Sequence, residues 1–286
     1  MRYLHNIKYA YKKRLIIWSR TLEKDTKVIL TADYHTHTPY SHGANTVAEN
    51  VARAKELGLQ AIGISDHGYS HIIYGLRRKE TKAYIAECKA AEKEYGIKVL
   101  VGIEANIRSI SGVADLTQKD FENFDLYLCG HHIYVNYEKT RELWAYGYGN
   151  WVRSSLLKKQ PTQKQIERNT TAYINVIKNN PIDAVTHVGY ICPANAVEVA
   201  KCASDYGTYI ELNSKKNHFT DEELSDIAVK TPARFIINSD AHSKDRVGDT
   251  KLVEEQLARV DFPMDRIDNI NGRLPSFRFA EFKKRM

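Results

Sequence analysis

The chain has 286 residues and a formal net charge of +7, and 43% of its residues are hydrophobic. This length suits one large domain or two small ones, and the composition excludes a disordered, collagenous or low-complexity protein. The longest apolar runs, about five residues, are too short to span a bilayer. No N-terminal stretch has the apolar core of a signal peptide, so we expect a cytoplasmic protein.

Short apolar runs alternate with amphipathic stretches along the whole chain. The runs predict strands at residues 28–33, 61–65, 98–104, 126–131, 184–187, 208–212 and 235–238. Helical spacing of apolar residues predicts helices at 46–57, 81–95, 162–178, 194–206, 221–230 and 250–260. Parallel strands need crossover connections, so repeated strand–helix units predict a parallel sheet, and seven of them favour closure into a barrel.

The positive charge is concentrated at the N-terminus. Residues 1–29 hold eight basic and two acidic side chains, so they carry +6, and residues 30–286 carry only +1. We therefore expect a basic extension at 1–29 followed by one domain at 30–286. The extension is either a solvated surface helix or a contact for nucleic acid, an acidic membrane surface or a protein partner.

The spacing of the cysteines bears on their chemical state. The four cysteines form no CxxC pair, which disfavours a cysteine-based zinc cluster and indicates reduced, buried thiols.

Residues 134–160 are rich in tyrosine and tryptophan and are expected to be irregular. They form either a packing loop or a lid over a substrate.

Side chains that can ligate metals gather at the C-terminal ends of the expected strands. They are His35, His37, His42, His67, Glu104, His132, His187, Asp240 and His242. In a parallel barrel the C-terminal ends of all strands lie at the same open end, called the mouth, and active sites lie there. Imidazole and carboxylate together suit zinc, manganese or iron more than calcium or magnesium. Nine ligands exceed the roughly four that one zinc ion takes, so a cluster of two or three ions is expected.

Six motifs resemble, in order, those of the PHP (polymerase and histidinol phosphatase) domain family. They are DYHTHTPYSHG (33–43), ISDHG (64–68), GIEANI (102–107), CGHHI (129–133), THVGY (186–190) and NSDAHS (238–243). The resemblance runs from about residue 31 to the C-terminus, and residues 260–277 are typical of a bacterial branch of monofunctional PHP phosphoesterases. It implies an α/β fold, a distorted seven-stranded (β/α)7 barrel that holds three divalent metal ions. Zinc is favoured, with manganese or iron as alternatives.

The resemblance also implies which residues hold each ion. The first ion would take His35, His37 and Asp240. The second would take His132 and His187, with Glu104 bridging it to the first. The third would take His42, His67 and His242. The family spacing selects His132 over its neighbour His131, which then supports a ligand, faces the substrate or is simply packed.

Other charged residues near these motifs are candidates for substrate contacts. Lys215, Arg246 and Arg108 each follow a strand-end motif and are either phosphate contacts or solvated surface charges. Asp66 either orients a ligand, donates a proton or caps the following turn. Three other histidines lack a partner pattern and are expected at the surface or in packing; they are His5, His71 and His218.

The implied ions suggest a mechanism and a function. Three dications offset by Glu104 and Asp240 would leave a mouth of about +4 that attracts a phosphate dianion. A water between two ions would be deprotonated near neutral pH and attack, while the third ion polarises phosphate oxygens. We therefore expect a phosphatase that hydrolyses a small phosphomonoester, for example histidinol phosphate, with Glu104, Asp240 and Asp66 as catalytic residues.

Two other functions compete with this one. A phosphodiesterase or exonuclease acting on nucleic acid or nucleotides is favoured by the basic extension and disfavoured by the nearly neutral domain. A non-catalytic scaffold has no reason to keep nine ligands at one mouth. The expected partner is a small phosphorylated substrate; nucleic acid is less favoured, and no membrane is expected.

Overall fold

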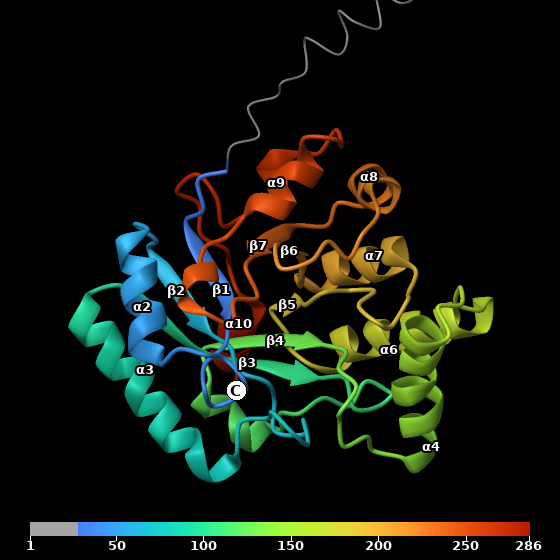
Figure 1. The fold of residues 1–286 in the computed structure, drawn as a ribbon, viewed down its shortest axis with the longest axis horizontal. Coiled ribbons are helices and arrows are strands. Elements are labelled where there is room, and N and C mark those ends of the chain that lie inside the picture. The colour runs from blue at the N-terminus through green and yellow to red at the C-terminus, as the bar shows by residue number, and fades with distance from the viewer. Residues whose placement is uncertain (1–27) are drawn as a thin grey trace, which may run out of the picture.

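The computed structural model describes residues 28–286, so the expected extension at 1–29 lies, apart from its last two residues, outside the described residues. Seven strands form one sheet in sequence order, and every neighbouring pair is parallel. They are β1 (Ala32–Thr36), β2 (Ala61–Ile64), β3 (Lys98–Asn106), β4 (Leu126–Gly130), β5 (Ala184–Val185), β6 (Tyr209–Asn213) and β7 (Phe235–Asn238). Figure 1 shows helices surrounding these strands.

The sheet closes into a distorted barrel, as expected. The amide of His37 donates to the carbonyl of Ala241 at 2.8 Å, and Thr36 forms a parallel bridge with the same residue. The amide of Tyr34 donates to Oδ1 of Asn238 at 3.0 Å. These contacts join the C-terminal halves of β1 and β7, so the predicted (β/α)7 barrel is confirmed.

The main helices begin and end where their local sequence directs. They are α2 (Val47–Glu56), α3 (Thr81–Tyr95), α6 (Gln163–Asn179), α7 (Ala196–Tyr206), α8 (Asp221–Lys230), α9 (Lys251–Leu257) and α10 (Arg278–Lys283). Reciprocal bonds between Thr46 and Glu49 cap the start of α2, and equivalent capping boxes start α6 and α8. Gly96 and Gly207 end α3 and α7 in the left-handed conformation that glycine tolerates best. No helix within residues 28–286 is long and apolar enough to cross a membrane.

The first strand differs from the expectation at its start. It begins at Ala32, not at residue 28. Leu30 forms an antiparallel bridge with Ile270, and the amide of Thr31 donates to the carbonyl of Asn269 at 2.8 Å. The apolar run at 28–31 therefore pairs mainly with the C-terminal segment, an outcome that local patterning does not reveal. On the β2 side, the carbonyl of Thr31 accepts from the amide of Gln60, just before β2, at 2.8 Å.

The expected irregular insertion at 134–160 is instead largely helical. It contains α4 (Thr140–Glu142), a π-helix (Leu143–Tyr148), α5 (Gly149–Trp151) and a second π-helix (Val152–Leu156). The wider π turns shift the apolar residues away from the 3.6-residue period, so the pattern resembles no regular helix. Tyr146 is fully buried, and of this segment only Tyr134 lines the pocket described below, which supports packing over a lid.

The core leaves one end of the barrel free for polar residues. A small apolar cluster of barrel residues includes Tyr34, Leu126, Leu128 and Tyr209. Phe277, from the C-terminal segment, packs edge-on against Tyr34 with ring centroids 4.8 Å apart. A second, larger cluster unites the outer faces of the strands with the helices. The apolar filling of the barrel thus sits away from the C-terminal strand ends.

Candidate active site

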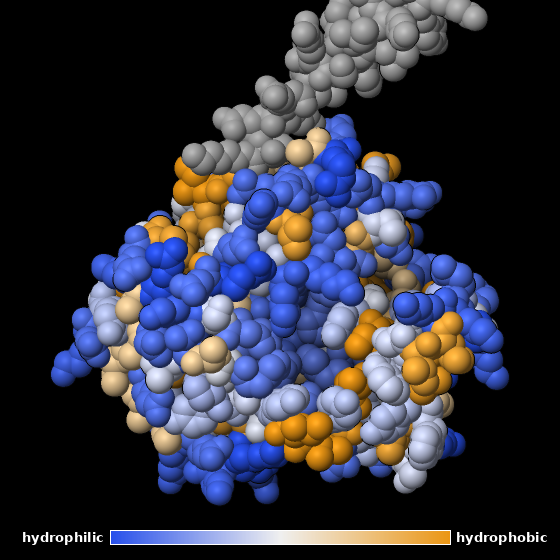
Figure 2. All heavy atoms as spheres, viewed as in Figure 1, coloured by the Kyte–Doolittle hydropathy of each residue, from blue (hydrophilic) through white to orange (hydrophobic). Residues whose placement is uncertain are grey.

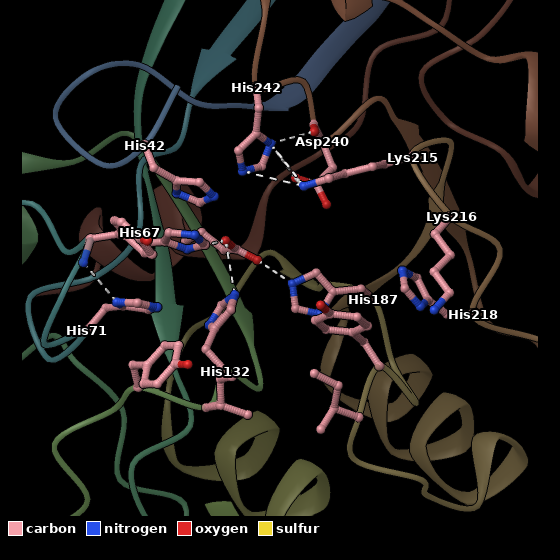
Figure 3. Close-up of a pocket in the computed structure, with 16 residues that line it drawn as sticks. His42, His67, His71, His132, His187, Lys215, Lys216, His218, Asp240 and His242 are labelled. Atoms are coloured by element: carbon pink, nitrogen blue, oxygen red, sulfur yellow. Dashed lines mark hydrogen bonds and ion pairs between the residues drawn. The ribbon is translucent and has the colours of Figure 1, made fainter. Parts of the chain in front are cut away.

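A cavity of about 390 Å³ opens at the C-terminal ends of the strands. Its lining contains seven histidines, two carboxylates (Glu104 and Asp240) and two lysines (Lys215 and Lys216). Figure 2 shows a hydrophilic hollow near the centre of this face. In Figure 3 the labelled side chains point toward the cavity from several different loops. The strand-end residues that the sequence singled out therefore converge on one place.

The residues expected to hold the first ion lie at the bottom of this site. His35 and His37 are fully buried, and their Nε2 atoms are 3.1 Å apart. Nε2 of His37 is 3.4 Å from Oδ1 of Asp240 and 3.8 Å from Oε2 of Glu104. Nε2 of His35 is 3.4 Å from the same Glu104 oxygen. Four potential ligands thus direct their ligating atoms at a common point.

Glu104 occupies the centre of the whole cluster. Its Oε2 lies 2.8 Å from Nδ1 of His67 and 3.3 Å from Nε2 of His132. Its Oε1 lies 2.6 Å from Nε2 of His187. An oxygen pair surrounded in this way suits a carboxylate that bridges neighbouring ions.

The remaining expected ligands lie along one side of the cavity. The ring of His42 is 4.2 Å from that of His242 and 4.9 Å from that of His67, measured between centroids. His67 was expected to hold only the third ion, but its Nδ1 faces Glu104, the expected bridge between the first two ions. Three overlapping groups therefore bring ligating atoms within metal-binding range, and they are His37–His67–His242, His35–His37–Glu104 and His67–Glu104–His132.

Unsatisfied polar atoms support the presence of metal ions here. Oε2 of Glu104 and Nδ1 of His67 are buried, and neither makes an aligned hydrogen bond with any described residue, although they are only 2.8 Å apart. Leaving such atoms without partners costs free energy that a bound cation would recover. The donor set of imidazoles and carboxylates fits zinc, manganese or iron.

The backbone at two strand ends is held in an unusual conformation. His187 and Asp240 have positive φ values of 32° and 49°. Such conformations cost energy for non-glycine residues and tend to occur at functional sites. Gly130 makes room for His187, because a Cβ atom at residue 130 would lie 2.6 Å from the His187 ring.

Several buried acceptors orient the expected ligands from behind. Oε1 of Glu211 lies 2.7 Å from Nδ1 of His35. Oδ1 of Asn106 lies 2.8 Å from Nδ1 of His132. Such acceptors fix an imidazole with Nδ1 protonated and Nε2 free to ligate. Neither residue was identified from the sequence; a charged Glu211 inside an otherwise apolar strand was the available signal.

Asp66 faces the loop after β1 and does not line the cavity. Its Oδ1 accepts from the amide of Thr38 at 2.7 Å and from the hydroxyl of Ser41. Oγ of Ser41 in turn lies 3.3 Å from Nδ1 of His37. Burial raises the pKa of Asp66 to about 6 against the opposing effect of these hydrogen bonds. This geometry supports an orienting role over proton donation.

The expected substrate contacts fall into two groups. Lys215 lines the cavity, with Nζ 3.3 Å from Oδ1 of Asp240 and 3.0 Å from Nδ1 of His242. Arg246 pairs with Asp249 at 2.9 Å, Arg108 donates to the carbonyl of residue 136 at 3.0 Å, and neither lines the cavity. Of these three expected contacts, only Lys215 therefore lies where it can reach a substrate in the cavity.

The remaining histidines are distributed differently from the expectation. His131 is fully buried beside Tyr146, with ring centroids 4.6 Å apart, and faces away from the cavity. His71 and His218 line the cavity, a position that the sequence did not indicate, although His71 is also packed against the ring of His67 as one of the expected alternatives had it. Both sit on loops whose path the sequence does not define. His5 lies outside the described residues.

Glu104, His37 and His67 have the charge states that suit metal binding at neutral pH. Burial alone would raise the pKa of Glu104, but the surrounding imidazoles, His132 foremost, hold that pKa well below its ordinary value. Burial lowers the pKa of His37 and of His67 well below the usual range. An ionised carboxylate and neutral imidazoles are the forms that ligate metals. Although burial opposes it, Glu104 and the neighbouring carboxylates raise the pKa of His35 and of His187, so these two rings would release a proton on binding an ion.

Residues 33–215 match the PHP domain. The chain belongs to the PHP domain family. A probable phosphatase of Acetivibrio thermocellus is 28% identical over 262 residues, which cover 88% of this chain and 95% of that protein. A probable phosphatase of Thermoanaerobacter pseudethanolicus is 30% identical over 233 residues, which cover 77% of this chain and 82% of that protein. This PHP protein is a phosphoesterase, and so a hydrolase.

A solved structure supports the fold of this PHP protein. The histidinol phosphate phosphatase of Lactococcus lactis, complexed with zinc, L-histidinol and phosphate, superposes with a TM-score of 0.53 at 14% identity. The superposition covers 87% of this chain and 99% of that one. At 14% identity, this similarity shows a shared fold and nothing further about the two proteins.

Proposed function

We propose that this PHP protein hydrolyses a small phosphomonoester at a site of three divalent metal ions. The observation that carries the proposal is the position of Glu104 Oε2, which lies within 3.8 Å of imidazole nitrogens of His35, His37, His67 and His132. One ion cannot use so many ligands, whereas a bridged cluster can. Zinc is the favoured ion, with manganese and iron as alternatives.

The proposed ligands follow the grouping that the family resemblance implies. His35, His37 and Asp240 would hold one ion, His132 and His187 a second, and His42, His67 and His242 a third, with Glu104 as the bridge between the first two. Divalent ions at such a site activate water for attack and polarise phosphate oxygens when bound. The chain's own contribution is to hold the ligands in register and to place Lys215 where it can pair with a phosphate oxygen.

The walls of the cavity favour a small substrate with an apolar or flat part. Five apolar or aromatic side chains also line the cavity, and they are Tyr74, Ile133, Tyr134, Tyr190 and Ile191. A volume of about 390 Å³ suits a small molecule and is at the low end for ligand pockets. Histidinol phosphate, a ring-bearing phosphomonoester, remains one candidate substrate.

Metal analysis followed by a phosphate-release screen tests the proposal. We expect the purified protein to bind close to three equivalents of zinc, manganese or iron, and to release phosphate from monoesters faster than from diesters. His37→Ala and Asp240→Ala should each abolish most of the release, whereas Lys230→Ala, on the surface of α8, should not. Normal turnover by both ligand variants would exclude a metal-dependent reaction, and a preference for diesters would favour the phosphodiesterase alternative.

A further inference from the structure

His71 is a cavity residue whose chemistry differs from that of the metal-ligand histidines. It lies in the loop after β2, is only 3% exposed and lines the cavity. Its ring stacks on that of His67, with centroids 4.9 Å apart and an interplanar angle of 14°. Figure 3 shows one ring nitrogen of His71 engaged in a hydrogen bond and the ring facing the cavity.

The loop that carries His71 is held in place by its backbone. The amide of Ile72 donates to the carbonyl of Tyr134 at 2.7 Å, and His71 forms an antiparallel bridge with Val135. The amide of Gly75 donates to the carbonyl of His71 at 3.0 Å, and a Cβ atom at Gly75 would lie 2.6 Å from that same oxygen. The glycine therefore permits a tight turn that fixes the imidazole.

The hydrogen bond to the ring determines where its proton resides. Nδ1 of His71 faces the backbone amide of Tyr74 at 3.0 Å. An amide can only donate, so Nδ1 must accept, and the neutral ring must carry its proton on Nε2. Among residues 28–286 the only hydrogen bond to the His71 ring is this one at Nδ1, and none reaches Nε2. His71 therefore presents an unused N–H donor at the cavity.

Two of the metal-ligand histidines, His35 and His132, show the opposite arrangement. Nδ1 of His35 faces the Glu211 carboxylate, and Nδ1 of His132 faces the amide oxygen of Asn106. The Asn106 orientation is fixed because its Nδ2 donates to Asp115 at 2.6 Å. Those rings carry the proton on Nδ1 and keep Nε2 free to ligate. His71 could ligate through Nε2 only by placing two donors face to face.

We propose that His71 is a substrate-binding residue whose Nε2–H donates a hydrogen bond to an oxygen of the phosphorylated substrate. The inference rests on the proposed phosphatase function and adds a residue outside the metal ligands. A neutral donor suits this place, because it stabilises a phosphate oxygen without repelling the bound cations. His67 and His132, which pack against the His71 ring, place that donor beside the cluster.

Two substitutions separate the proposed contact from a structural role. His71→Asn keeps an oxygen near Nδ1 for the Tyr74 amide and removes the donor at Nε2. His71→Gln places an amide N–H near the position of Nε2. With p-nitrophenyl phosphate as substrate and inorganic phosphate as competitive inhibitor, His71→Asn should raise both KM and the inhibition constant about tenfold. His71→Gln should recover most of this loss, and the metal content of both should match the wild type.

Each other outcome overturns the inference. Unchanged phosphate affinity in His71→Asn would show that Nε2 makes no contact, and lost metal would show that His71 is a ligand. His71→Phe, which keeps the stacked ring and removes both nitrogens, gives the same test if the asparagine variant does not fold. A wild-type protein that binds metal but hydrolyses no phosphoester would refute the proposed function itself. Phosphate binding to that protein, measured by calorimetry, would still distinguish wild type from the variants.

Discussion

Oε1 of Glu211 lies 2.7 Å from Nδ1 of His35, and both side chains are fully buried. Although burial opposes ionisation, His35 above all keeps the pKa of Glu211 below its ordinary value. Oε2 of the same carboxylate accepts from the backbone amide of His187 at 2.9 Å. One glutamate on β6 thus orients two proposed ligands that belong to different ions.

Replacing Glu211 should therefore weaken metal binding without removing a ligand. We expect Glu211→Ala to lower the affinity for zinc about 10- to 100-fold, because His35 loses the acceptor that fixes its tautomer and orientation. Competition with a coloured chelator at pH 7 measures this affinity. Glu223→Ala, at the exposed start of α8, is the matched control and should retain wild-type affinity. Equal affinities for both variants would contradict an orienting role.

Much of this site could be predicted from sequence, because it depends on where strands end. His35, His37 and Glu104 each fall at a strand terminus that apolar runs define, and parallel topology brings such termini together. The positions of His71 and His218 depend on the path of loops. No periodic pattern encodes that path, and the sequence assigned neither residue to the cavity.

Other differences have non-local causes. Leu30 pairs with Ile270, some 240 residues away, so a local apolar run could not show that β1 begins later. Asn106 can orient the His132 ring only because the pairing of β3 with β4 brings the two residues together. Tyr146 lies in a π-helix whose period hides its buried face from a search for ordinary helices. In each case the missing information was a contact between distant segments or a departure from regular geometry.

Lys215 is expected to contribute to phosphate binding more than its neighbour. Its Nζ lies 3.3 Å from Oδ1 of Asp240, beside the cluster, whereas Nζ of Lys216 lies 5.7 Å from the ring centroid of Tyr190. Lys215→Ala should raise KM for a phosphomonoester about tenfold, since a charged hydrogen bond is lost. Lys216→Ala should raise KM by less than about threefold. Steady-state kinetics at constant ionic strength measures KM for both variants. A larger rise in KM for Lys216→Ala than for Lys215→Ala would contradict this assignment.

Asp66 should tolerate loss of its charge. Its oxygens accept from the amide and hydroxyl of Thr38, and an asparagine can retain the amide bond through its own carbonyl oxygen. We expect Asp66→Asn to keep kcat within about tenfold of wild type. A proton donor would lose roughly 100- to 10,000-fold on the same change. A loss of that size, with metal content unchanged, would show that Asp66 transfers a proton during the reaction.

His131 should make stability depend on pH, because it is a buried base with no hydrogen-bond partner in the described part of the chain. Both ring nitrogens lack partners among residues 28–286, and burial lowers the pKa of His131 well below its ordinary value near 6.5. Below that pH the unfolded chain takes up a proton at this residue and the folded chain does not. The histidine therefore destabilises the fold progressively as the pH falls.

Phenylalanine at this position removes the proton and keeps a ring against Tyr146. Going from pH 7.5 to pH 5.5, the free energy of unfolding of His131→Phe should therefore rise by up to about 1.4 kcal/mol relative to wild type. Any packing difference between the two rings is independent of pH and cancels in this comparison. Urea denaturation of both proteins at both pH values measures this change in unfolding free energy. The proteins are first treated with a chelator, so that metal release in acid does not contribute. An equal difference in unfolding free energy at the two pH values would mean that folded His131 takes up its proton as readily as the unfolded chain.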